Sequence, residues 1–276
     1  MSGLLTTAPT SRIASRGARE LNAVWTVAAR DILITVKRPS SAAAALVLPL
    51  IMMGMVGGNL MQNMTAGLDF DFGQFMFVGM LVNMLFMMTT MGMSSLVDDA
   101  DDNYSAELLV SPVSRYAIVL GKIVGSSFVA VVGCLGVMLV GLAMDITLAP
   151  WQWLALLGLA PLMCLSGGAL AMIVMGSIKS NKAANMVVML ITMPQMFLSG
   201  VIIPIGHSSG VLYLLSRVLP MTYCVDLGRA VAYAGRPDYD AVVLFNPAVS
   251  LLVIAGLTVL CLVVGTILYA RSEKNR

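Results

Sequence analysis

Charged residues are scarce in this chain of 276 residues. Aspartate, glutamate, lysine and arginine together make up 11% of it, whereas hydrophobic residues make up 59%. Soluble domains usually contain about 25% charged and about 45–50% apolar residues. The composition therefore excludes an ordinary soluble domain and predicts an integral membrane protein surrounded by the lipid bilayer. The net charge of +2 gives no sign of binding to nucleic acid.

Residues that could act in catalysis or bind a metal are also few. The chain has four cysteines without metal-ligand spacing and one histidine, His207, which argues against a metal site. His207 adjoins Ser208 in "GHSSG", but this stretch follows an apolar run instead of the strand that a nucleophile elbow requires, so an intramembrane hydrolase is disfavoured. Gly121-Lys122 lacks the rest of a phosphate-binding loop. We expect no catalytic residue, metal or cofactor in this chain.

Long apolar runs are what the chain has in abundance. About 20 apolar residues cross roughly 30 Å of hydrocarbon as a helix, and the sequence predicts an all-α fold with six such spans. The first 20 residues contain arginines but no apolar core of signal-peptide length, so we expect them to stay in the cytoplasm. The six spans are expected near residues 40–60, 73–97, 123–144, 152–176, 184–205 and 246–270.

The distribution of lysine and arginine predicts the orientation. Of the sixteen, all but Arg217, Arg229 and Arg236 fall at the N-terminus, near the loops after the second and fourth spans, or in the C-terminal tail. The positive-inside rule then places both termini in the cytoplasm. We expect a multi-pass protein of the inner (plasma) membrane of a bacterium.

Residues 18–37 predict an amphipathic helix before the first span. At about 100° per residue, Leu21 and Trp25 fall on one face and Arg19 and Arg30 on the other. A basic face opposite a face with tryptophan suits the headgroup layer of the inner leaflet. The alternative is a soluble amphipathic helix packed on a partner.

Residues 206–240 form the largest segment expected on the outer side. They contain two apolar pieces on either side of Pro220, each too short to span the membrane, which predicts re-entrant or interfacial helices. Asp226 and Arg229 are three positions apart, so we expect them to neutralise each other.

Methionine is concentrated in the second span. Met80, Met84 and Met87 recur there at helical spacing, with Asn83 among them. Three interpretations stay open: gap-filling in a helix bundle, the polarizable wall of a pathway for varied apolar substrates, and a site for a soft metal. Asn83 at that depth needs a helix partner or a wet cavity.

Three stretches, in this order, resemble the type-2 membrane domains of ATP-binding-cassette (ABC) exporters. They are "ELLVSPVSRYAIVLGK" at 107–122, "NMVVMLITMPQMFLSGVIIP" at 185–204 and "LPMTYCVDLGRA" at 219–230. The resemblance covers nearly the whole chain and implies a single membrane domain over residues 1–276. It implies a second permease subunit, identical or different, and a cytoplasmic ABC ATPase that carries ATP and Mg.

The resemblance also implies which residues act. Residues 98–115 match the coupling segment that meets the ATPase, with Asn103 where glycine is usual; asparagine tolerates a left-handed backbone. The aspartates at 98–102 are either a solvated face or complementary to a basic groove on the ATPase. The candidates for ATPase coupling are Asp101, Asn103, Glu107, Ser111, Pro112 and Arg115; for the pathway Asn83, Met80, Met84, Met87, Phe197 and Ser199; for the outer re-entrant segment Pro204, Pro220, Tyr223, Asp226 and Arg229.

The expected function is that of the permease subunit of an ATP-driven exporter. No charged residue lies between Ile123 and Met144, and charged substrates usually require ionisable partners inside the membrane, so we expect a hydrophobic or amphipathic substrate such as a drug or lipid. The alternative is a membrane partner of an ATPase that senses or remodels without moving a solute.

Overall fold

The computed structural model describes residues 16–37, 51, 70–93, 115–178, 180–205 and 210–274. Every regular element in these ranges is a helix. The helices are α1 (Arg16–Val36), α4 (Phe72–Gly92), α7 (Arg115–Ala143), α8 (Pro150–Ser177), α9 (Asn181–Leu198), α10 (Val211–Val218), α11 (Pro220–Ala232), α12 (Tyr239–Val242) and α13 (Pro247–Lys274).

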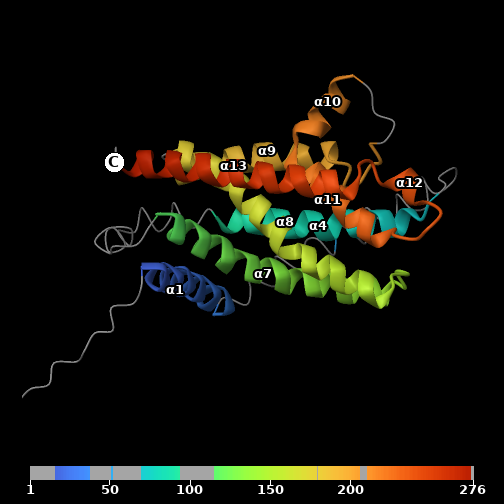
Figure 1. Cartoon of the computed structure of the whole chain (residues 1–276), viewed down its shortest axis with the longest axis horizontal. Helices are drawn as coiled ribbons and strands as arrows, with labels where there is room; N and C mark the ends of the chain where they lie inside the picture. The colour runs from blue at the N-terminus through green and yellow to red at the C-terminus, as the bar shows by residue number, and fades with distance from the viewer. Residues whose placement is uncertain are drawn as a thin grey trace, which may run out of the picture.

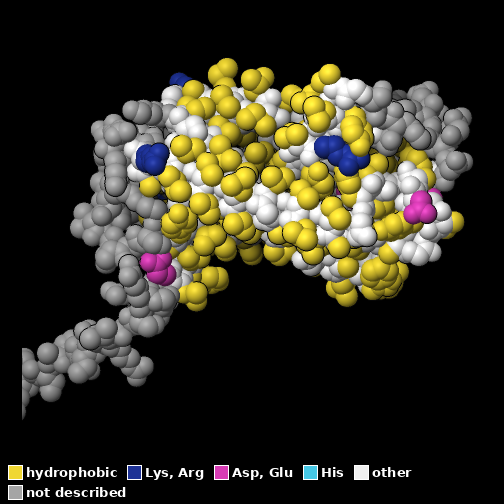
Figure 2. Space-filling model, turned by 45° about the horizontal axis from the view of Figure 1, so that its top comes forward, with side chains coloured by type: hydrophobic (Ala, Val, Ile, Leu, Met, Phe, Trp, Pro, Cys, Tyr) yellow, Lys and Arg dark blue, Asp and Glu magenta, His cyan; other side chains and the backbone are white. Residues whose placement is uncertain are grey.

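Four of the described helices are long and apolar enough to cross a membrane: α4, α7, α8 and α13. They run along the long axis of the molecule, and α8 packs against the other three (Figure 1). Hydrophobic side chains cover most of the face shown in Figure 2, with only small groups of charged side chains between them. The chain is an integral membrane protein.

These helices match four of the six expected spans. Helix α7 begins at Arg115, before the start near residue 123 that was expected for the third span, and it packs against α1 at Gly121 and Gly125. The expected span over 40–60 lies outside the described residues.

The expected fifth span over 184–205 is wrong at its outer end. Helix α9 ends at Leu198, and Gly200 has a φ of +74°, a left-handed conformation in which glycine is favoured. Residues 201–205 are not helical. The 18 residues of α9 are about 27 Å long at 1.5 Å per residue, so α9 is shorter than the four long helices.

Local sequence signals explain where several helices begin. Asp71 caps α4, because its Oδ1 accepts hydrogen bonds from the backbone N–H of Gly73 (2.9 Å) and Gln74 (3.1 Å). Pro150 and Pro220 are the first residues of α8 and α11, a position where the missing N–H of proline costs nothing.

The hydrophobic core is centred on α4. This helix is apolar all round and most of its residues are buried, as expected for a helix that neighbours cover on all sides. Its phenylalanines pack against α7, α8 and α11. Phe77, for example, meets Trp153 edge-on with ring centroids 5.5 Å apart.

The two ends of the bundle differ. Helix α1 and the C-terminal end of α13 lie at one end, and α11 and α12 lie at the other (Figure 1). Helix α1 packs along α7, whereas α10 projects from the opposite end of the bundle. The side of the membrane on which each end lies stays a prediction from the distribution of lysine and arginine.

Candidate functional site

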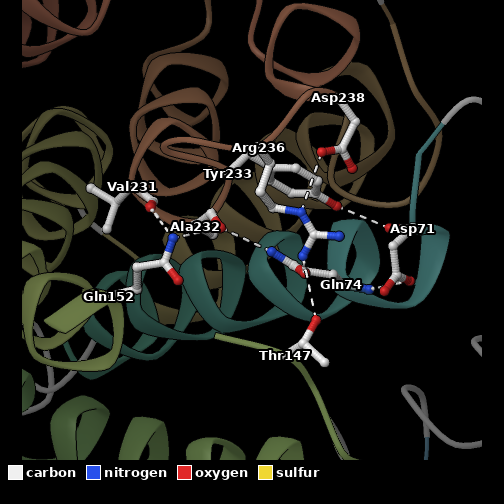
Figure 3. A network of polar contacts seen from close by, with 9 residues as sticks. All are labelled: Asp71, Gln74, Thr147, Gln152, Val231, Ala232, Tyr233, Arg236 and Asp238. Atoms are coloured by element: carbon white, nitrogen blue, oxygen red, sulfur yellow. Dashed lines mark hydrogen bonds and ion pairs between the residues drawn. The ribbon is translucent and has the colours of Figure 1, made fainter. Parts of the chain in front are cut away.

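The C-terminus of α11 is held by glutamines from two long helices (Figure 3). Gln74 of α4 donates from Nε2 to the carbonyl oxygen of Ala232 at 2.9 Å, and Gln152 of α8 donates to those of Val231 (3.1 Å) and Ala232 (3.0 Å). The last carbonyls of a helix have no partner within the helix. The glutamines supply those partners and tie α11 to the N-terminal ends of α4 and α8.

Arg236 and Tyr233 extend this network beyond α11. Arg236 donates from Nη1 to Oε1 of Gln74 and from Nε to Asp238 at 3.2 Å, and the Tyr233 hydroxyl donates to the carbonyl oxygen of Asp71 at 2.9 Å. In Figure 3 Arg236 lies between Asp238 and Gln74. Sequence reasoning placed Arg236 only on the outer side and missed the network, because Gln74 is 162 residues away in the sequence.

Arg229 links α11 to the end of α9. Its side chain is 2% exposed and donates from Nη2 to the carbonyl oxygens of Gly200 (2.6 Å) and Val201 (3.3 Å). The guanidinium lies 3.4 Å from the centroid of the Phe75 ring, close enough for a cation–π interaction. Burial lowers the pKa of Arg229 to about 9, so the side chain stays protonated at neutral pH.

Asp226 links α11 to the start of α13. Its carboxylate accepts hydrogen bonds from the backbone N–H of Leu244 (2.6 Å) and Phe245 (3.3 Å) and from the Ser250 hydroxyl (2.9 Å). Burial raises the pKa of Asp226, and these hydrogen bonds oppose the rise. Asp226 and Arg229 each favour the charged form of the other, as the sequence predicted, but their hydrogen bonds go to different neighbouring elements.

The other candidates of the outer segment lie around α11. Pro220 begins this helix, and Pro204 lies in the non-helical stretch after α9. The Tyr223 hydroxyl donates to the carbonyl oxygen of Arg217 at 2.8 Å, and its ring stacks on Phe245. The structure has the short helices α10 and α11 in this segment; that they are re-entrant or interfacial helices on the outer side stays a prediction.

An ion pair joins α1 to α7 at the opposite end of the bundle. Lys122 Nζ lies 3.0 Å from Asp31 Oδ1, and the lysine side chain is only 3% exposed. Gly121 and Gly125 let the helices approach closely, since a Cβ at either position would lie 2.8 Å from a side-chain atom of α1. The sequence placed Lys122 at a membrane edge and did not predict this partner.

The residues predicted to line the transport pathway differ in burial and do not form one continuous surface. Met80 and Met84 are buried in the core, Met87 and Asn83 are partly buried, and Ser199 is buried at the end of α9. Phe197 is 50% exposed on the outer surface of α9. The burial of Met80 and Met84 favours gap-filling for those two residues, and Ser199 directly follows the last residue of α9.

Of the coupling candidates, only Arg115 lies within the described residues. It is the first residue of α7. The other five, and the aspartates at 98–102, lie outside them, as do His207 and Ser208. Among the described residues, no three His, Cys, Asp or Glu side chains gather into a group that suits a metal.

Comparison with known proteins identifies the family. The ABC-2 type transporter family matches residues 22–233, which is most of the chain. The chain belongs to the ABC-2 type transporter family. This confirms the resemblance seen in the sequence and makes the chain an ABC transporter membrane component, a permease that by family carries no nucleotide-binding site of its own.

A relative of known name agrees with this assignment. The chain is similar to Nodulation protein J of Rhizobium meliloti (strain 1021), with 28% identity over 127 residues. The match covers 45% of this chain and 47% of the relative. The chain therefore matches about half the length of that relative.

Proposed function

We propose that this ABC-2 permease is the membrane subunit of an ATP-driven exporter that moves a hydrophobic or amphipathic molecule, such as a drug or lipid, out of the cytoplasm. A separate cytoplasmic ABC ATPase binds ATP and Mg and drives the change between inward-facing and outward-facing states. For that change to be driven, ligand and nucleotide must bind the two states with different free energies.

The observation that carries the proposal is the position of Arg115. The last residue of the expected coupling segment is the first residue of α7, a helix of 29 residues. Helix α7 packs on α1 along its first half and on α4 in the core. A displacement of the segment by the ATPase therefore acts on one end of a long, continuous helix and reaches the core directly.

The exposed surface of α9 supports the proposal that a second permease subunit binds there. Met186, Leu190, Met193 and Phe197 are each about half exposed or more, and α9 makes fewer contacts with its neighbours than the long helices do. We propose that this face, or part of it, meets the second subunit, identical or different. The orientation is that of a bacterial plasma-membrane protein with both termini in the cytoplasm.

The proposed coupling is tested by ATPase activity. The chain is reconstituted in liposomes with its ATPase, and hydrolysis is measured with and without a fluorescent amphiphile. We expect Pro112→Ala and Asp101→Asn to lower the stimulation by the amphiphile while membrane insertion stays normal, because both residues lie in the segment that meets the ATPase. Leu252→Met on the exposed surface of α13 is the control.

Unchanged stimulation in both variants contradicts the proposed docking. The alternative function, a sensor or remodelling partner of an ATPase, predicts ATP hydrolysis without movement of any amphiphile across the membrane. Transport measured in the same liposomes separates the two functions.

A further inference from the structure

Helix α10 carries an exposed apolar stripe. Its members are Val211, Leu214, Leu215 and Val218, whose exposed fractions are 74%, 66%, 45% and 68%. The last three follow the first after three, four and seven positions, which is the spacing of one helix face. Helix α10 projects sideways from the bundle (Figure 1), and no other described helix covers this face. We call these four residues the α10 stripe.

Arg217 is the single charged residue of α10 and directly precedes Val218. Its side chain is exposed. Among the residues that the structure describes, no carboxylate lies within ion-pair distance of its guanidinium, and no oxygen accepts a hydrogen bond from it. A charged side chain beside a surface that faces lipid is costly without a partner. We therefore expect the partner of Arg217 to come from outside the chain.

Aromatic rings from separate elements surround Arg217. Its Cζ atom lies 4.5 Å from the centroid of the Tyr213 ring and 4.2 Å from that of the Phe245 ring, close enough for cation–π interactions with both. Tyr223 of α11 stacks on Phe245 with ring centroids 5.0 Å apart. The Tyr223 hydroxyl also donates to the carbonyl oxygen of Arg217 at 2.8 Å. Both the side chain and the backbone of Arg217 are therefore held in place.

The aromatic contacts order the guanidinium before any ligand binds. Phe245, one of the two rings, is itself fixed, because its backbone N–H donates to Asp226 at 3.3 Å. A side chain that is already ordered loses less conformational entropy when a ligand arrives. The contacts with the rings also leave the N–H groups of the guanidinium available as donors. Arg217 is thus a positive charge that is both oriented and open to an anion.

The chemistry of this surface fits a phospholipid better than a protein. The planar fork of N–H donors in arginine matches the oxygens of a phosphate group. The α10 stripe consists only of leucine and valine, which are under-represented among the residues that dominate binding between proteins. Aliphatic side chains beside a basic residue are typical of a helix that lies at the boundary of headgroups and acyl chains. One molecule that carries a phosphate next to acyl chains satisfies both features.

We propose that α10 binds a phospholipid of the surrounding bilayer, with the phosphate on the guanidinium of Arg217 and the acyl chains against the α10 stripe. This lipid is a resident of the membrane and is distinct from the transported molecule. It holds α10 at the membrane surface and, through the contacts of Tyr223 and Phe245 with Arg217, steadies the junction of α10, α11 and the segment before α13. Binding requires neither ATP nor the ATPase.

The experiment measures lipid contact at α10 in the full chain. The chain is purified in dodecyl maltoside, a detergent without phosphate. Cys261→Ala leaves only buried native cysteines, and Val218→Cys in the α10 stripe carries a fluorophore. Phosphatidylglycerol or diacylglycerol with the same brominated acyl chains is then added, and quenching of the fluorophore is recorded.

The two lipids differ in the phosphate headgroup and share their acyl chains. We expect phosphatidylglycerol to reach half of its maximal quenching at about fivefold lower lipid content than diacylglycerol, the effect of one arginine on an anionic headgroup. Arg217→Gln should remove this difference. Lys37→Gln, which removes an exposed cation at the end of α1, should preserve it.

Two further variants separate the charge from the stripe and from folding. Leu214→Asn should weaken quenching by both lipids alike, because it disturbs only the contact with acyl chains. Tyr213→Leu removes one of the rings beside Arg217 and should reduce the difference between the lipids, so it replaces Arg217→Gln if that variant fails to insert. An excess of inorganic phosphate should not displace phosphatidylglycerol, since it makes no contact with the stripe.

Equal quenching by the two lipids in the chain with Arg217 intact overturns the inference, and so does a difference that persists in both Arg217→Gln and Tyr213→Leu. Displacement of the lipid by inorganic phosphate also overturns it, because the site would then bind a free anion. Absence of quenching by either lipid means that protein, such as a second copy of the chain, covers the α10 stripe, which again contradicts the inference.

Discussion

At the scale of single residues, the buried side chains of Lys122 and Arg229 each connect two helical segments. The sequence did not predict that either side chain is buried. The sequence showed Lys122 and Arg229 only as positive charges on opposite sides of the membrane. Their partners are an aspartate 91 residues away and backbone carbonyls that only a non-helical turn exposes. Pairings between distant segments leave no periodic signal in a single sequence, so only the structure reveals them.

Removal of Arg229 tests its link to α9. Arg229→Met keeps the bulk of the side chain but removes the donors to the carbonyl oxygens of Gly200 and Val201. We expect the free energy of unfolding to fall by about 2–3 kcal/mol because buried carbonyls lose their partners, seen as a lower melting temperature in detergent. Arg217→Met at an exposed position is the matched control. Equal melting temperatures for both variants would refute the link.

Loss of the Lys122 charge tests the ion pair between α1 and α7. Lys122→Met leaves the carboxylate of Asp31 without this partner in a partly buried place, and we expect a loss of about 3 kcal/mol. The double variant with Asp31→Leu should recover most of it, because the carboxylate that lost its lysine is then removed as well. Thermal unfolding of the three proteins in detergent decides the question; an additive double variant contradicts a direct pairing.

At the scale of helices, the sequence predicted which segments form long helices better than it predicted the residues at which the helices end. The apolar runs at 152–176 and 246–270 match α8 and α13 within a few residues, because the need to cross the bilayer fixes their length. The fifth span was drawn too long, since the apolar residues after Leu198 continue the hydrophobic signal although Gly200 turns the chain. Hydrophobicity reports burial in protein and in lipid alike, so it does not mark such a turn.

The close approach of α4 to the end of α9 predicts an effect of added bulk. Gly79→Ala places a methyl group 2.3 Å from the carbonyl oxygen of Val201, so the segment must shift, at a cost of about 1–3 kcal/mol. In Gly158→Ala nothing lies within 4 Å of the new Cβ, and better helix propensity should leave stability equal or slightly higher. The melting temperatures of the two variants are compared in detergent. Equal melting temperatures would contradict the close contact between Gly79 and Val201.

At the scale of the whole molecule, the fold combines a well-packed body with a loosely attached helix. Helices α4, α7, α8 and α13 pack closely, and α11 is bonded to α4, α8 and α13 through Gln74, Gln152 and Asp226. Helix α9 is attached less extensively to the other described helices. Such packing suits a transporter in which α9 moves relative to the closely packed helices α4, α7, α8 and α13.

The central claim is that ATP hydrolysis by a partner moves an amphiphile through this chain. The most direct measurement is ATP-dependent uptake of the fluorescent amphiphile into inside-out vesicles that contain the chain and its ATPase, compared with vesicles whose ATPase cannot hydrolyse ATP. The account predicts uptake above the passive level only with the active ATPase. Uptake that is equal in both, while the complex is assembled and hydrolyses ATP, would contradict it.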